Sequence, residues 1–94
     1  MAISLKLPRR LRRQWAIKIR DRECVEPPHV SILRGRRTWR IELRTHEFMD
    51  DEPDPAEVPK SILKTLDENW EFLCASWDAM YPENPVASTE DEDE

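Results

Sequence analysis

Apolar and polar residues alternate with a period of two in three stretches of the first half of the chain. One stretch begins at Trp15, one follows Pro28 and one ends at Leu43. Because successive side chains of a strand point to opposite faces, this alternation predicts three strands that each have one apolar face. The predicted inward-facing residues are Trp15, Ile17, Ile19, Val30, Ile32, Trp39, Ile41 and Leu43.

Gly35 and Arg36 separate the second and third predicted strands, and Gly35 is the only glycine of the sequence. A type II′ turn needs a positive φ at its first central position, which glycine adopts without strain. A two-residue loop here pairs Ile32 with Trp39. The same register places His29 opposite Glu42 and joins the two apolar faces without a bulge.

The second half of the chain changes to a helical period. Between Pro59 and Pro82 apolar residues recur at spacings of three and four, which predicts an amphipathic helix of roughly five turns. This helix is expected to cover the apolar face of the sheet. The spacing also fits a heptad, so a homodimer formed through the helix remains an alternative. The apolar stripe consists of Leu63, Leu66, Trp70, Leu73, Trp77 and Met80.

Two shorter segments complete the predicted organisation. Pro8 precedes an arginine-rich stretch that can form a short N-terminal helix, and Asp54 can cap a single helical turn in the acidic segment that follows Leu43. The predicted fold is therefore α+β, with a three-stranded antiparallel sheet covered on one face by a long C-terminal helix. Residues 1–82 form a single domain, and residues 83–94 form a disordered acidic tail.

Charge is distributed unevenly along the sequence, whose net charge is −5. Residues 1–46 hold 13 Lys and Arg against 4 Asp and Glu, and residues 47–94 hold 2 against 16. The outward strand positions and the turn predict a basic sheet face and hairpin tip that bind RNA or DNA, aided by the arginines of residues 9–13. The alternative is a solvated face that the protein's own acids balance. The predicted nucleic-acid-binding residues are Lys18, Arg20, Arg22, Arg34, Arg36, Arg37, Arg40 and Arg44.

His29 and Glu42 form the one acid–base pair that the predicted register places together. A carboxylate opposite an imidazole favours the protonated ring, as a general acid in ribonucleolytic cleavage would require. His46 falls on the same predicted outward face as Glu42 and can supply the second group. The ordinary alternative is a packing or surface histidine. Cys24 and Cys74 have no metal-ligand spacing, so the sequence predicts reduced cytoplasmic thiols and no metal or cofactor site. No apolar stretch approaches the ~20 residues that span a membrane.

Four short motifs carry a resemblance to a known family. They are Pro27-Pro28-His29 at a strand start, the glycine turn, Val58-Pro59-Lys60 at the helix entry, and Glu68-Asn69-Trp70 late in the helix. Over residues 15–77 the chain resembles a bacterial family of small domains of unknown function, often encoded in gene pairs similar to toxin–antitoxin operons. The resemblance implies a partner protein encoded nearby. The family commonly has a second histidine where this chain has Ser31.

Three functions follow from these observations. The first is a small interaction or regulatory module of a toxin–antitoxin-like pair, which binds a protein partner and, through its basic face, nucleic acid. The second is a ribonuclease-type toxin that uses His29 with Glu42 or His46. The third is a non-enzymatic assembly protein that forms a homodimer through the long helix.

Overall fold

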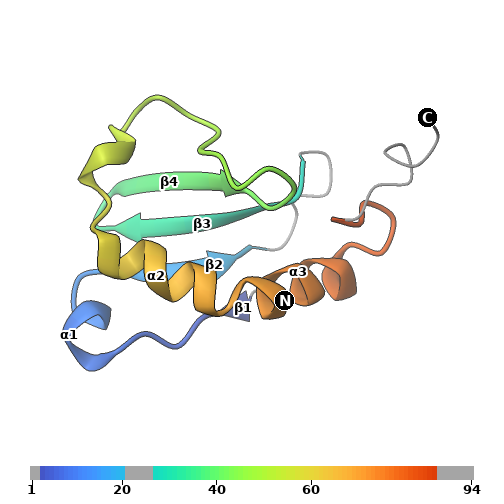
Figure 1. Cartoon of the computed structure of the whole chain (residues 1–94), viewed down its shortest axis with the longest axis horizontal. Coiled ribbons are helices and arrows are strands. Elements are labelled where there is room, and N and C mark those ends of the chain that lie inside the picture. The colour runs from blue at the N-terminus through green and yellow to red at the C-terminus, as the bar shows by residue number, and fades with distance from the viewer. Residues whose placement is uncertain (1–2, 21–26, 87–94) are drawn as a thin grey trace.

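The computed structural model describes residues 3–20 and 27–86, and in them an antiparallel sheet is covered on one face by helices. Figure 1 shows α2 and α3 following one another along one side of the sheet. The α+β class and the antiparallel sheet are therefore confirmed. The elements in chain order are β1 (Ile3–Ser4), α1 (Arg9–Arg12), β2 (Ala16–Ile19), β3 (His29–Arg34), β4 (Arg37–Glu42), the 3-10 turn η1 (Pro55–Glu57), α2 (Lys60–Glu68) and α3 (Trp70–Met80).

The predicted number of three strands is wrong, because β1 adds a fourth strand at the edge of the sheet. Ile3 lies opposite Ile19 and Ser4 opposite Lys18. The Leu5 N–H extends this pairing by donating to the Ile17 carbonyl at 2.8 Å. A strand of two residues is too short for a period of two to reveal, and its pairing with β2 is a tertiary contact that local sequence does not encode.

The β3–β4 hairpin has the predicted register and turn. Gly35 has a φ of 60°, as a type II′ turn requires at its first central position. After β4 the chain turns back, and Phe48 forms an isolated bridge with Ile41 that covers part of the β4 edge. The confirmed pairs include His29 with Glu42, Val30 with Ile41, and Ile32 with Trp39.

The prediction of a single long helix is not confirmed, because the helix is interrupted at Asn69. Asn69 has φ −116° and ψ 17°, and its side-chain amide donates to the Thr65 carbonyl at 2.9 Å. Asn side chains that bind nearby backbone groups compete with regular helical hydrogen bonding, which explains why the helix stops here. The buried side of the two helices also differs in part from the predicted stripe. Ile62, Leu66, Leu73 and Trp77 are buried, whereas Leu63, Trp70 and Met80 are only partly buried.

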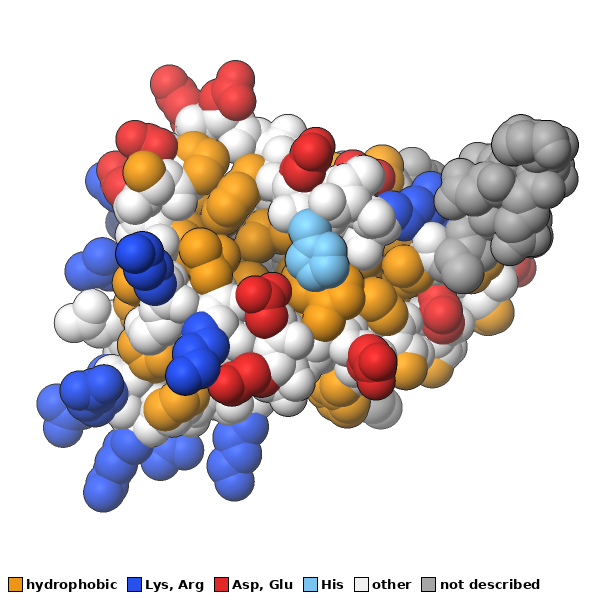
Figure 2. Space-filling model, in the orientation of Figure 1, with side chains coloured by type: hydrophobic (Ala, Val, Ile, Leu, Met, Phe, Trp, Pro, Cys, Tyr) orange, Lys and Arg blue, Asp and Glu red, His pale blue; other side chains and the backbone are white. Residues whose placement is uncertain are grey.

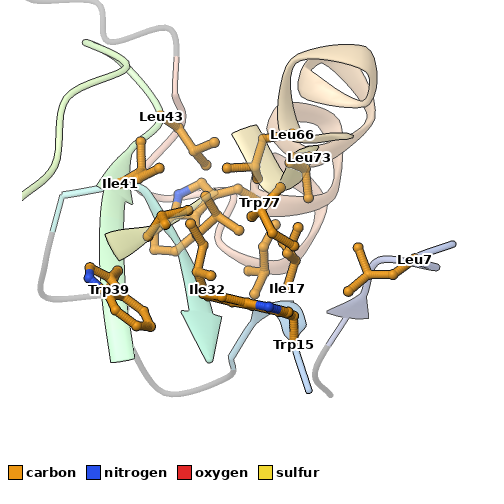
Figure 3. Close-up of a cluster of buried hydrophobic side chains, with 14 of the residues drawn as sticks. Leu7, Trp15, Ile17, Ile32, Trp39, Ile41, Leu43, Leu66, Leu73 and Trp77 are labelled. Carbon is orange, nitrogen blue, oxygen red and sulfur yellow. The ribbon is translucent and has the colours of Figure 1, made fainter. Parts of the chain in front are cut away.

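The hydrophobic core lies between the sheet and the two helices. In Figure 3, Ile17 and Ile32 of the sheet face Leu73 and Trp77 of α3. All eight predicted inward residues of the sheet are buried, which confirms the period-two analysis. Leu7, Val58, Ile62 and Tyr81 complete the core, and none of these four was predicted to be there.

After α3 the chain folds back onto the domain in a segment that we call the terminal strap, residues 84–86. The Trp77 indole N–H donates to the Asn84 carbonyl at 2.7 Å, and Arg44 Nε donates to the Val86 carbonyl at 2.9 Å. Packed structure therefore continues past Pro82, the predicted end of the domain, to Val86. The predicted site residue Arg22, Cys24 and residues 87–94 of the acidic tail lie outside the described residues. None of the described helices combines the length and apolar character needed to cross a bilayer.

Candidate nucleic-acid interface

Seven exposed arginines gather at the end of the molecule where α1 lies beside the β3–β4 turn. In Figure 2 a dense group of basic side chains occupies the end at which Figure 1 shows these two elements. We call this surface the arginine end. It consists of Arg9, Arg10, Arg12, Arg13, Arg34, Arg36 and Arg37.

Trp15 joins the two segments that form the arginine end. Its backbone N–H donates to the Leu11 carbonyl of α1 at 2.9 Å. Its ring lies 5.3 Å from the guanidinium carbon of Arg34, and the indole itself is only 8% exposed. This cation–π contact places Arg34, the last residue of β3, over Trp15, three residues beyond the end of α1. The core residue Trp15 therefore holds the two arginine clusters side by side.

Local sequence explains why the arginines of α1 point outward. The Pro8 carbonyl accepts hydrogen bonds from Leu11 and Arg12, which begins a single helical turn after the proline. Leu11 packs against the core, so the remaining positions of this short turn face solvent. Arg9, Arg10 and Arg13 line one shallow hollow with Gln14, and the hairpin tip lines another with Arg34, Arg36 and Arg37.

The charge of the arginine end is largely uncompensated within the described part of the chain. Arg37 is the only one of the seven that forms an ion pair there, with Glu57 of η1. The Arg37 and Glu57 side chains are 57% and 44% exposed, so solvent screens this pair. Closely spaced guanidinium groups on an exposed surface attract anions, and each guanidinium can bind a phosphate through two hydrogen bonds.

The predicted basic sheet face is divided by the register of the strands. Arg34 and Arg37 pair with each other and share the parity of Ile32 and Trp39, so they belong to the side covered by the helices. Lys18 and Arg40 lie opposite Ser31, one from each neighbouring strand, and belong to the other side. The structure therefore gathers the hairpin arginines with α1 rather than with the sheet-face residues.

The arginines of the sheet face bind groups of this chain. Arg40 donates through Nε and Nη2 to the two carboxylate oxygens of Asp50, at 2.9 and 2.8 Å. This hydrogen bonding lowers the pKa of Asp50, with a smaller opposing effect of burial. Arg44 binds the terminal strap through the Val86 and Pro85 carbonyls and the Asn84 side chain. Lys18 and Arg20 are partly buried.

His29, the first predicted catalytic residue, has an exposed fraction of 0%. Its Nδ1 lies 2.9 Å from the Pro27 carbonyl oxygen, and its ring centroid lies 5.6 Å from that of Trp77. Glu42 is opposite in the register, and its carboxylate accepts a long hydrogen bond of 3.5 Å from the Thr45 hydroxyl. The imidazole therefore occupies a packed position beside α3, where no substrate reaches it.

His46, the second predicted histidine, lies on the surface. Its backbone has a φ of 67°, and its ring is stacked on Trp70 with centroids 3.6 Å apart and planes 19° apart. His29 instead contacts Trp77, which is seven residues or about 10 Å further along α3. The structure thus assigns the two histidines to different tryptophans and different environments, one enclosed and one exposed.

The remaining titratable side chains of the described residues form no candidate metal centre. Within residues 3–20 and 27–86 no group of three or more His, Cys, Asp and Glu side chains is placed to hold a metal ion. Cys74 is partly buried; burial, followed by the charges of Asp78 and Glu71, raises the pKa of its thiol. This thiol is therefore protonated and weakly nucleophilic at neutral pH.

Comparisons with protein-family models, curated proteins and solved structures each found no match to this chain. The family resemblance drawn from the short sequence motifs thus stays a prediction. Any functional assignment depends on the geometry and charge described above.

Proposed function

We propose that the protein is a small, non-enzymatic interaction module whose arginine end binds the phosphate backbone of a nucleic acid. The observation that carries this proposal is the convergence of seven exposed arginines from two separate segments. Of these seven arginines, only Arg37 forms an ion pair within the described residues. Neutralising phosphates with such side chains releases condensed counterions, which supplies sequence-independent affinity. A regulatory role beside a partner protein, which the sequence resemblance implies, is part of this proposal.

The surroundings of the arginines favour recognition of the backbone over stacking on bases. Trp15, the aromatic residue of this end, is buried and has Arg34 over its ring. Phe72 is the one large hydrophobic side chain that is exposed in the described part of the chain, and it belongs to α3. Single-strand binding proteins stack bases on exposed aromatic rings, and the arginine end offers none. Phosphate contacts would position the nucleic acid with little sequence preference.

The geometry gives less support to a ribonuclease. A general acid must come within hydrogen-bond reach of the group that it protonates. His29 is enclosed beside Trp77, and His46 is stacked on Trp70 at the α2–α3 junction. Neither imidazole belongs to the arginine end, where we expect the phosphates to bind. We therefore propose binding without cleavage.

The test is a titration of a fluorescently labelled 20-base-pair RNA and a DNA of the same length, followed by anisotropy at several salt concentrations. We expect log K to fall linearly with log salt, by about 0.9 per neutralised phosphate of B-form DNA. The double variant Arg10→Ala with Arg36→Ala should reduce this slope by about 1 to 2 and weaken binding to both nucleic acids. Both residues are exposed, so thermal unfolding should change little.

A matched control removes two positive charges outside the arginine end. Lys60→Ala with Lys64→Ala, two exposed positions of α2, changes the net charge equally, while leaving both arginine clusters intact. We expect this control to keep most of the affinity and of the salt slope. Equal losses in the two double variants would mean that net charge alone drives binding. Absence of binding at low salt would exclude the proposed function.

A further inference from the structure

The junction of α2 and α3 carries a second surface that nucleic-acid binding does not use. His46, Trp70 and Phe72 line a shallow hollow on the outer side of the helices, which we call the aromatic hollow. Phe72 is 51% exposed, and Trp70 is only partly buried. Figure 2 shows a histidine lying on apolar side chains with acidic side chains around it. The rim of the hollow consists of Asp67, Glu68, Asn69 and Glu71.

The hollow lies at the helix break at Asn69. The last residues of α2 supply Asp67 and Glu68, and the first turn of α3 supplies Trp70, Glu71 and Phe72. Trp70 is partly exposed in the hollow that three carboxylates also line. No ion pair within the described residues involves any of these three acids.

His46 is held on the surface at a conformational cost. A non-glycine residue with a φ of 67° is uncommon, and such conformations gather at functional sites. The backbone N–H of His46 donates to the Glu42 carbonyl at 2.9 Å, which closes the turn after β4. Its ring lies nearly parallel to that of Trp70, with centroids 3.6 Å apart, and the residue is exposed. The hollow thus contains a fixed aromatic platform.

We propose that the aromatic hollow docks an arginine-bearing segment of a partner protein. A guanidinium group is planar and stacks on aromatic faces, while its N–H groups reach carboxylates in the same plane. Aromatic rings beside three carboxylates that form no ion pair within residues 3–20 and 27–86 complement both properties. The same carboxylates repel nucleic acid, so this surface and the arginine end select partners of opposite charge. The inference does not depend on the arginine end and goes beyond nucleic-acid binding.

The experiment uses the full chain and a short capped peptide that carries two adjacent arginines. The matched control peptide carries citrulline, which is planar and uncharged, in place of both arginines. Binding is followed in ¹H–¹⁵N spectra by the indole N–H signal of Trp70, assigned through its loss in Trp70→Phe. We expect a dissociation constant of about 1 mM for the arginine peptide, and at least about fivefold weaker binding of the citrulline peptide.

Variants of the hollow separate its acidic rim from its aromatic surface. Glu68→Gln with Glu71→Gln should weaken the arginine peptide about fivefold, and Phe72→Ala should weaken both peptides. Asp51→Asn with Glu83→Gln, which removes two exposed acids outside the hollow, is the matched control and should leave binding unchanged. The arginine-end variant Arg10→Ala with Arg36→Ala should bind the peptide normally, so failure here is distinguishable from failure of nucleic-acid binding.

Three outcomes would overturn this proposal. The first is no shift of the Trp70 signal at millimolar peptide. The second is equal binding of the arginine and citrulline peptides, which would indicate a merely apolar contact. The third is salt-sensitive self-association that both the rim variant and the arginine-end variant abolish, because the occupant would then be a second copy of this chain.

Discussion

Trp70 and Trp77 are two turns apart on α3, and their replacement by alanine should have unequal effects on stability. Trp77 is 0% exposed, and its ring lies 4.2 Å from that of Tyr81 and 5.6 Å from that of His29. Removing a side chain of this size from a packed core costs ~3–5 kcal/mol. The change also deletes the indole donor to the Asn84 carbonyl, a further cost of about 1 kcal/mol.

Trp70 contributes less because it is only partly buried. Its ring packs against the edge of the core and stacks on that of His46, and such aromatic pairs contribute about 0.5–1.5 kcal/mol beyond area burial. With some loss of apolar burial, we expect Trp70→Ala to cost about 1–2 kcal/mol in total. The sequence stripe treats the two tryptophans alike and would assign ~3–5 kcal/mol to each.

The assay is urea unfolding followed by far-UV circular dichroism. A domain of this size has a total stability of only about 5–10 kcal/mol, so Trp77→Ala can leave no folded population. Trp77→Phe keeps most of the volume while removing the indole N–H, and should cost about 1–2 kcal/mol. A loss for Trp70→Ala that equals that of Trp77→Ala, or exceeds about 3 kcal/mol, would refute the environments assigned to these residues.

Three further predictions concern single contacts. Because the folded-state pKa of Asp50 is lowered, its pairing with Arg40 stabilises the fold at pH values above the ordinary carboxyl pKa. This stabilisation is lost as the pH falls through the lowered pKa. Asp50→Asn should therefore cost about 0.5–1 kcal/mol at pH 7 in urea unfolding, and the difference from the unchanged protein should vanish in acid. Arg44→Met removes the side-chain hydrogen bonds that hold the terminal strap, so it should cost about 2 kcal/mol and accelerate amide exchange at Val86. Gly35→Ala meets no steric contact but retains a φ of 60°, so thermal unfolding should show a cost of about 1–2 kcal/mol.

The sheet was predictable because its signals are local. A single glycine between two alternating stretches defines both the turn and the register, so the pair of His29 and Glu42 followed from counting along the chain. The burial of His29 did not follow, because the period-two alternation assigned His29 to the outer face of the sheet. Its enclosure depends on Trp77 of α3, which approaches the start of β3 only in the folded structure.

The helical part and the charged surface were less predictable for the same reason. The helical spacing of apolar residues does not reveal where a single Asn interrupts the helix. Here the Asn69 side chain binds the Thr65 carbonyl in the preceding turn, and the helix is divided at this residue. The sequence showed an excess of basic residues in the first half of the chain, but it did not show which of them lie together on the surface. Their grouping depends on Trp15, which brings α1 and the end of β3 together through a core position.

The terminal strap also bears on the order in which the structure forms. Arg44 and Val86 are 42 positions apart, and Tyr81 binds a carbonyl 61 positions away, whereas the hairpin closes around a two-residue turn. Closing a longer loop costs more chain entropy, so we expect the hairpin to form before the strap contacts. Weakening the strap by Arg44→Met should then raise the unfolding rate while leaving the refolding rate nearly unchanged. In stopped-flow measurements, slowed refolding of this variant would show instead that the strap closes before the rate-limiting step.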